Sequence, residues 1–304
     1  MKRRNVLSLL AAACVLAACA TAEQPAAPPE PADAFSSDRI SVVAQGVGPD
    51  VILIPGLSSH RDIWASTAAT FDGDYRLHLV QVSGFAGVEP GANADGPVAA
   101  PVAEEIARYI EEEGLERPAV IGHSMGGTIA MMLAARHPAD VGKLMVVDMF
   151  PFMGAMFGPP GSSAEDVRPT ADQMRTQMLA APPGMSEGII RQTIAGMVRT
   201  EAARPAIVQH SLDSNRRTVA NAFHELIVTD LRPELANISA PLTALYVIPP
   251  QMPLTEEQYE GYMHASYENA PDARLIRIDD SYHFIMVDQP ELFLAHVRMF
   301  LESN

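Results

Sequence analysis

The sequence has only two cysteines, Cys14 and Cys19, and both lie in its first nineteen residues. The rest of the chain can form no disulfide, which excludes a small fold held together by disulfides, even in an oxidising compartment. Apolar residues make up 48% of the 304 residues, so a core large enough for one large domain can form without cross-links.

Basic residues are also scarce. The sequence has 21 lysines and arginines against 37 aspartates and glutamates, which gives a net charge of −16. Because nucleic-acid binding depends on basic contacts with phosphates, this balance argues against a nucleic-acid partner and disfavours strongly anionic substrates. The sequence also lacks a metal-ligand spacing, a phosphate-cradling loop and a dinucleotide fingerprint, so no cofactor is expected.

The N-terminus is typical of an export signal. The stretch MKRRNVLSLLAAACVLAAC joins basic residues 2–4 to an apolar run, Val6–Ala18, which is too short to span a bilayer comfortably. The run ends in LAAC, which resembles a bacterial lipobox. We therefore predict a lipoprotein signal peptide at residues 1–18 and a lipid on Cys19, which would anchor the protein in the bacterial cell envelope, facing the periplasm or at the outer membrane. An ordinary secretory signal cleaved after ACA, residues 18–20, is the alternative.

An Ala/Pro-rich stretch follows the predicted signal. Its composition, ATAEQPAAPPEPADA, offers nothing to pack, so residues 19–38 are predicted to form a lipidated tether. Residues 39–304 are then predicted to form the folded domain.

Strand-like and helix-like segments alternate in this domain. Uninterrupted apolar strands between helices indicate an α/β fold with a mostly parallel, doubly wound sheet covered on both faces. Residues 150–238 contain no convincing strand, which predicts a helical cap inserted before the penultimate strand. The predicted strands are 51–54, 77–82, 119–121, 144–147, 242–248 and 275–278, and the predicted helices are 98–113, 125–137, 256–269 and 290–301.

A serine motif lies directly after one predicted strand and directly before a helix. Gly122-His123-Ser124-Met125-Gly126 has the G-x-S-x-G pattern of a nucleophile elbow, in which small residues allow a sharp turn. The helix that follows offers backbone N–H groups to a developing oxyanion. Ser124 is therefore predicted to be a nucleophile.

From about Arg39 to its C-terminus the chain resembles the α/β-hydrolase superfamily, in its single-domain form with a helical cap. In that family an earlier turn, usually containing His-Gly, supplies the second oxyanion donor. Pro55-Gly56-Leu57 occupies that place here, and the donor is a backbone N–H, so Pro55 in place of histidine need not remove it. The resemblance implies an oxyanion hole formed by the N–H groups of Leu57 and Met125.

The family's catalytic histidine lies in a loop near the C-terminus, after a strand and before a helix. Tyr282-His283-Phe284 and Asp288-Gln289-Pro290 match that layout, with Tyr282 where glycine is usual. The resemblance implies that His283 is the general base for Ser124.

In this family a carboxylate usually orients the catalytic histidine and completes a triad with the serine. In most of the superfamily it follows the strand matching Leu242–Ile248, where this chain has Met252, which cannot accept the imidazole N–H bond. Asp148, at the end of the preceding strand, is the favoured replacement because strand ends face the crevice of a parallel sheet. Glu256 or Glu257, or a Ser-His dyad without an acid, are the alternatives.

Serine, histidine and an oxyanion hole together indicate acyl transfer to water. Aromatic and methionine residues at the start of the cap suggest an apolar pocket, so we predict hydrolysis of carboxylic esters of apolar small molecules. The alternatives are an envelope-anchored peptidase, which would use acids of the cap to hold a substrate ammonium, and a catalytically weak binding or accessory protein. The residues behind the pocket prediction are Phe150, Phe152, Met153, Met156 and Phe157, and the cap acids are Glu165, Asp166, Glu187, Glu201 and Asp213.

Overall fold

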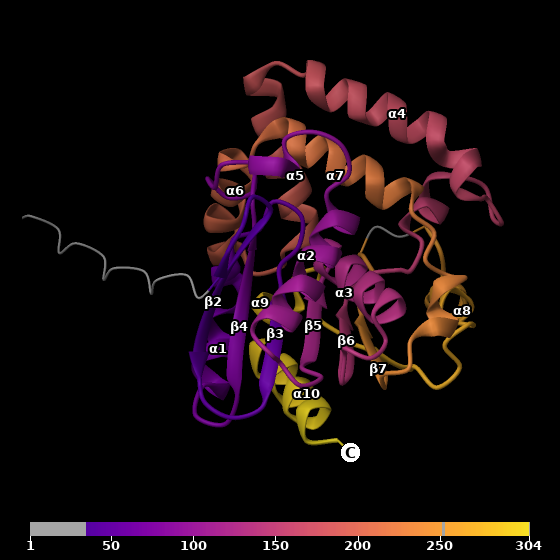
Figure 1. The fold of residues 1–304 in the computed structure, drawn as a ribbon. Coiled ribbons are helices and arrows are strands. Elements are labelled where there is room, and N and C mark those ends of the chain that lie inside the picture. The colour runs from indigo at the N-terminus through magenta and orange to yellow at the C-terminus, as the bar shows by residue number, and fades with distance from the viewer. Residues whose placement is uncertain (1–34, 251–252, 304) are drawn as a thin grey trace, which may run out of the picture. The chain divides into compact units, whose positions relative to one another are not determined.

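A computed structural model describes residues 35–250 and 253–303. The predicted signal peptide, Cys19, most of the predicted tether and Met252 lie outside the described residues. Figure 1 shows a central sheet with helices on both of its faces. In the described part of the chain, no helix is both long enough and apolar enough to cross a bilayer.

Eight strands form a single sheet in the order β1-β2-β4-β3-β5-β6-β7-β8. The pairs β1–β2 and β2–β4 are antiparallel, and every neighbouring pair from β4 to β8 is parallel. The predicted α/β fold with a mostly parallel sheet is confirmed. The strands are β1 (Phe35–Ser36), β2 (Ile40–Gly46), β3 (Asp50–Ile54), β4 (Arg76–Val82), β5 (Ala119–His123), β6 (Lys143–Val147), β7 (Leu242–Tyr246) and β8 (Arg274–Arg277).

Each face of the sheet has its own apolar core, because side chains alternate along a strand. On β3, Ile52 and Ile54 lie in the core that α2, α3 and α8 cover, whereas Val51 and Leu53 lie in the core that α1, α9 and α10 cover. Burial on both faces explains the uninterrupted apolar runs of the sequence. These helices are α1 (Ala65–Phe71), α2 (Ala99–Glu112), α3 (Met125–Arg136), α8 (Glu256–Ser266), α9 (Ile285–Asp288) and α10 (Pro290–Glu302).

The chain between β6 and β7 forms helices and turns throughout. The helices of this cap lie together at one end of the sheet (Figure 1). The predicted helical cap before the penultimate strand is therefore confirmed. Its helices are α4 (Ala164–Ala180), α5 (Pro183–Met197), α6 (Arg204–Asp213) and α7 (Arg216–Val228), and short 3-10 turns lie at Met153–Phe157, Glu201–Ala203 and Glu234–Asn237.

A buried carboxylate ties the cap to the core. Glu225 on α7 is 7% exposed and accepts hydrogen bonds from the backbone N–H groups of Val98, Ala99 and Ala100, at 2.5, 2.7 and 2.9 Å. These groups lie at the start of α2, where N–H groups have no partner within the helix. The carboxylate therefore caps α2 and complements the positive end of its dipole.

Candidate active site

Ser124 lies on a tight turn between β5 and α3. Its φ of 53° and ψ of −122° are rarely adopted by a residue with a side chain. The turn requires glycine on both sides: a Cβ on Gly122 would lie 2.1 Å from the carbonyl oxygen of Gly126, and one on Gly126 would lie 2.2 Å from that of Ile54. The N–H of Ser124 donates to the carbonyl of Val147 at 2.9 Å, which ties the turn to the end of β6. Ser124 is left partly exposed at the tip of the turn.

A second turn, after β3, lies against the serine. Gly56 comes so close that a Cβ there would lie 3.1 Å from the Cβ of Ser124. Among the described residues, the backbone N–H groups of Leu57 and of Met125, the first residue of α3, have no hydrogen-bond partner. An oxyanion site requires free N–H donors of this kind beside the nucleophile. Leu57 follows Gly56 and Met125 follows Ser124, so both predicted donors lie on the two turns that meet at Ser124.

The side chains of Asp148 and His283 form a hydrogen bond across 135 residues of sequence. His283 Nδ1 lies 2.6 Å from Asp148 Oδ2, and the other carboxylate oxygen accepts from the N–H of Val247 at 3.0 Å. Asp148 has a φ of 52°, and its own N–H donates to the carbonyl of Leu245 at 2.8 Å. Because a carboxylate only accepts, Nδ1 of His283 carries a proton, and in the neutral ring the lone pair is then on Nε2.

His123 connects the histidine loop to the elbow. Its ring is buried, its Nε2–H donates to the carbonyl of His283 at 3.0 Å, and the two ring centroids lie 4.7 Å apart. Burial, together with the neighbouring His283, holds the pKa of His123 well below its usual range, so this ring is neutral. His283 therefore lies beside the elbow, although in the described residues no hydrogen bond joins it to Ser124.

Asp288 holds the histidine loop against the cap. Its carboxylate accepts from the backbone N–H groups of Tyr282, Arg199 and Thr200, at 2.9, 3.0 and 2.8 Å. The Arg199 guanidinium in turn pairs with Asp280 at 2.7 Å. The sequence indicated Asp288 only as part of a turn before a helix, because its bonds to the cap join positions almost ninety residues apart.

The other carboxylates near the position where the family usually has its acid do not contact His283 in the described residues. Glu256 begins α8 and pairs with Arg277 at 2.7 Å, and Asp279 pairs with the same arginine at 2.6 Å. Glu257 is exposed on the first turn of α8. Within the described residues, Asp148 is the carboxylate that contacts His283.

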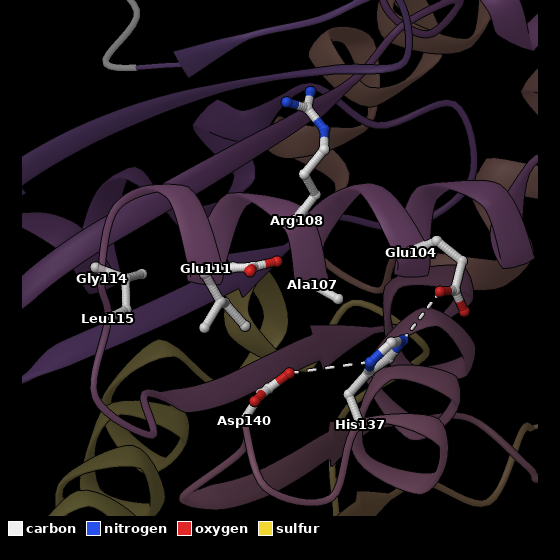
Figure 2. Close-up of a pocket in the computed structure, with 9 residues that line it drawn as sticks. Glu104, Ala107, Arg108, Glu111, Gly114, Leu115, His137 and Asp140 are labelled. Carbon is white, nitrogen blue, oxygen red and sulfur yellow. Dashed lines mark hydrogen bonds and ion pairs between the residues drawn. The ribbon is translucent and has the colours of Figure 1, made fainter.

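Two surface hollows lie apart from the serine. One of about 610 Å³ lies between α2 and the end of α3, where His137 faces Glu104 and Asp140 (Figure 2). The other, of about 300 Å³, is lined by residues 248–250 and 278–281 next to the histidine loop. None of the predicted catalytic residues lines either hollow.

The aromatic residues at the start of the cap pack within the protein. Phe152 is buried in a small core of the cap, and Phe157 meets the ring of Phe223 edge-on at 6.2 Å. Phe150 lies against α8, with its ring 5.0 Å from that of Tyr262. Met156 is 49% exposed. The phenylalanines that suggested an apolar pocket thus contribute to the packing of the cap.

Comparison with known proteins decides the family. Residues 51–296 match the alpha/beta hydrolase family. The chain belongs to this family. A pimeloyl-[acyl-carrier protein] methyl ester esterase of Aeromonas hydrophila is 26% identical to the hydrolase over 279 residues, which cover 86% of this chain and 99% of that protein.

Solved structures agree with this assignment. An esterase from Exiguobacterium antarcticum superposes with a TM-score of 0.70 at 20% identity, covering 87% of this chain and 96% of the other. A hydrolase from Pseudomonas aeruginosa also gives a TM-score of 0.70 at 20% identity, covering 87% and 94%. The α/β-hydrolase fold is confirmed, and the family and its esterase members confirm the prediction of an ester-hydrolysing enzyme.

Proposed function

We propose that this hydrolase cleaves carboxylic esters of apolar small molecules through an acyl-enzyme, with Ser124 as nucleophile, His283 as general base and Asp148 as the acid that orients it. The observation that carries the proposal is the 2.6 Å bond between His283 Nδ1 and Asp148 Oδ2, beside a serine on a strand-to-helix turn. Nucleophile, base and orienting group are recognised by this geometry and by their roles, whatever their order in the chain.

Acylation begins when the Ser124 hydroxyl attacks the ester carbonyl and gives its proton to His283 Nε2. The carbonyl oxygen becomes an oxyanion and accepts hydrogen bonds from the N–H groups of Leu57 and Met125. The imidazolium then protonates the leaving alcohol, and Asp148 stabilises the positive charge. The contact between Ser124 and His283 tightens when substrate is bound, as is common for catalytic hydrogen bonds.

Deacylation repeats these steps with water. His283 removes a proton from water, which attacks the acyl-enzyme carbonyl, and the same N–H pair stabilises the second oxyanion. Collapse of this intermediate releases the carboxylic acid and returns the proton to Ser124. No cofactor is required for any of these steps.

The relatives suggest where to search for the substrate. Several are named as esterases of a methyl ester whose acyl chain is carried by a protein. We propose that this hydrolase likewise accepts a largely apolar acyl chain and a small alcohol. A panel of methyl and p-nitrophenyl esters of increasing acyl length tests this, and a preference for large alcohols with short acyl groups would contradict it.

The peptidase alternative finds little support in the cap. Each of the five acids that could hold a substrate ammonium is exposed. Each carboxylate bonds to a residue three or four positions away in the sequence, so none is held toward the serine by a long-range contact among the described residues. The pairs are Glu165 with Arg168, Asp166 with Ser163, Glu187 with Arg191, Glu201 with Arg204, and Asp213 with Gln209.

A fluorophosphonate probe tests the proposed mechanism and separates it from a binding or accessory role. We expect the probe to label the wild-type protein on Ser124 and to leave Ser124→Ala unlabelled. Ser124→Ala and His283→Ala should each lower ester hydrolysis by about three orders of magnitude, and the double variant should be little worse than either one, because the two residues act as a unit. An unlabelled wild-type protein would favour the accessory role, and additive losses would mean that the two residues do not share a mechanism.

We also propose that a lipid on Cys19 holds the enzyme at the bacterial cell envelope. The support is the basic start, short apolar run and LAAC stretch of the sequence. Facing the periplasm or at the outer membrane, such an enzyme would meet its ester substrate near the membrane.

A further inference from the structure

Three side chains with metal-binding atoms meet where the cap contacts the core. His60 and Asp62 follow β3, and His210 belongs to the last turn of α6 in the cap. Asp62 Oδ1 lies 3.3 Å from His60 Nδ1 and 3.6 Å from His210 Nε2. All three ligand atoms lie within 4.8 Å of one another, and the two imidazole centroids are 5.6 Å apart.

These separations suit one small divalent ion. Zinc binds imidazole nitrogen and carboxylate oxygen at about 2.0–2.2 Å in tetrahedral geometry, which places neighbouring ligand atoms about 3.3–3.5 Å apart. The two distances to Asp62 are close to that edge length. A small rotation of the imidazoles would bring the third pair to the same spacing.

The main chain on both sides of the cluster is held to the end of β4 or to the loop that follows it. The N–H of Arg61, between His60 and Asp62, donates to the buried side chain of Gln81 at 2.8 Å. On the cap side, the Ser214 hydroxyl donates to the carbonyl of His210 at 2.7 Å and accepts from the N–H of Ala86 at 2.9 Å. The ligands are thus placed by the surrounding fold, which lowers the ordering cost of binding.

The chemistry of the cluster also fits a cation. The imidazoles are 23% and 19% exposed, and the carboxylate is 55% exposed, so an ion held by them would still be open to water as a fourth ligand. The Asp62 carboxylate lies beside both imidazoles, so an ion bound there would contact an oxygen ligand and two nitrogen ligands. An ion would displace the weak bond, 3.2 Å long, that His60 Nδ1 accepts from the N–H of Asp62.

Other histidine–carboxylate contacts do not converge in this way. His137 faces Glu104 through Nε2 and Asp140 through Nδ1, on opposite sides of its ring, so the two acids cannot share one ion (Figure 2). In the part of the chain that the structure describes, His224 contacts one carboxylate, that of Asp172, at 2.8 Å. Among the described residues, the His60, Asp62 and His210 group has the convergence that a metal ion needs.

We propose that His60, Asp62 and His210 form a Zn²⁺ site that joins the cap to the core. The ion is bound by His60 Nδ1, Asp62 Oδ1 and His210 Nε2, with water completing the tetrahedron. Each imidazole binds the ion through a nitrogen lone pair, so binding displaces any proton on that nitrogen. The bound ion fastens α6 to the turn that follows β3, three residues beyond Leu57. This site does not depend on the proposed function.

Calorimetric titration of the metal-free folded protein with zinc sulfate, in a buffer that does not chelate, tests the proposal. We expect the titration to give about one zinc per chain. Thermal unfolding should show a rise in Tm of about 5 °C when the free zinc concentration is about a hundred times Kd. Cobalt should give the visible absorption of a tetrahedral N/O site. His60→Asn, Asp62→Asn and His210→Asn should each weaken binding at least tenfold.

His224→Asn is the matched control, because it removes an imidazole with one carboxylate partner and should leave zinc binding unchanged. Asp62→Asn is the variant least able to disturb folding, since its side chain is 55% exposed, and circular dichroism verifies the fold of each protein. Zinc binding that persists in His60→Asn and Asp62→Asn, or a wild-type protein that binds no zinc at 100-fold molar excess, would overturn the proposal.

Discussion

Asp148 Oδ2 lies 2.6 Å from His283 Nδ1, and the residue that carries this carboxylate has a left-handed backbone at the end of β6. The strained conformation turns the carboxylate toward β7, where the N–H of Val247 holds its second oxygen. Both oxygens are therefore bonded before any substrate binds. The proposed base and its proposed acid are thus joined at the ends of two neighbouring strands, β6 and β7.

Replacing this carboxylate should impair chemistry more than binding. We expect Asp148→Asn to lower kcat by about 10²–10⁴-fold with a much smaller change in KM, because the amide can neither fix the Nδ1–H tautomer nor stabilise the imidazolium. Steady-state ester hydrolysis measures both constants. Glu256→Gln removes a carboxylate that pairs with Arg277 and should be nearly silent. Full activity of Asp148→Asn would remove the residue from the proposed triad.

The stability of the folded protein should depend on Glu225, which joins the cap to α2. We expect Glu225→Ala to lower the free energy of unfolding by about 2–4 kcal/mol, because three N–H groups at the start of α2 lose a buried charged acceptor. Urea denaturation followed by circular dichroism measures the loss. Glu234→Ala is the control, since Glu234 makes a partly exposed salt bridge with Arg136 and should cost less than about 1 kcal/mol. Equal losses in the two variants would contradict a capping role.

Stability should fall in mild acid because of buried neutral histidines. Burial lowers the pKa of both His123 and His78 in the folded state. The unfolded chain therefore takes up protons below about pH 6.5 that the folded chain cannot bind, so stability is complete above that pH and is lost toward the lower folded pKa values. Each histidine contributes a slope of up to about 1.4 kcal/mol per pH unit. Urea titrations at several pH values between about 5 and 7.5 should show a shallower slope for His123→Gln, and an unchanged slope would exclude His123 as a source.

Lipid attachment should depend on the second of the two cysteines. We expect Cys19→Ser to abolish incorporation of labelled palmitate and to leave the protein unprocessed or released from the membrane. Cys14→Ser is the matched control, because Cys14 lies within the predicted signal and should not affect labelling. Equal labelling of the two variants would rule out the lipobox.

The sequence predicts the parallel part of the sheet well because those strands are buried on both faces. Each predicted strand from 51–54 to 275–278 lies within two residues of an observed one. Strand β2 was not predicted, although its residues Ile40, Val42 and Val43 are buried. It mixes polar and apolar positions and pairs antiparallel with β4, so it lacks the continuous apolar run that marked the other strands.

At the candidate site, too, the sequence predicts features that depend on neighbouring residues and misses those that depend on long-range contacts. The turn at Ser124 is encoded by adjacent glycines, so the sequence alone predicts it. The three bonds of Glu225 and the grouping of His60 with His210 depend on contacts more than a hundred residues apart, and no local pattern indicates them. Asp148 was one of three alternatives because the sequence cannot show that β6 and β7 end side by side.

The order of the parts along the chain has a consequence for biosynthesis. The elbow and Asp148 are made in the first half of the chain, whereas His283 comes just before the last two helices of the described residues, α9 and α10. Phe293 of α10 stacks on Trp64 and closes one core of the sheet. Domains generally fold as units during synthesis, so this domain can complete its core only when its last helices are available. A nascent chain that has not reached residue 283 has the proposed nucleophile but lacks the proposed base. Under the proposed mechanism, ester cleavage therefore requires synthesis to continue past His283.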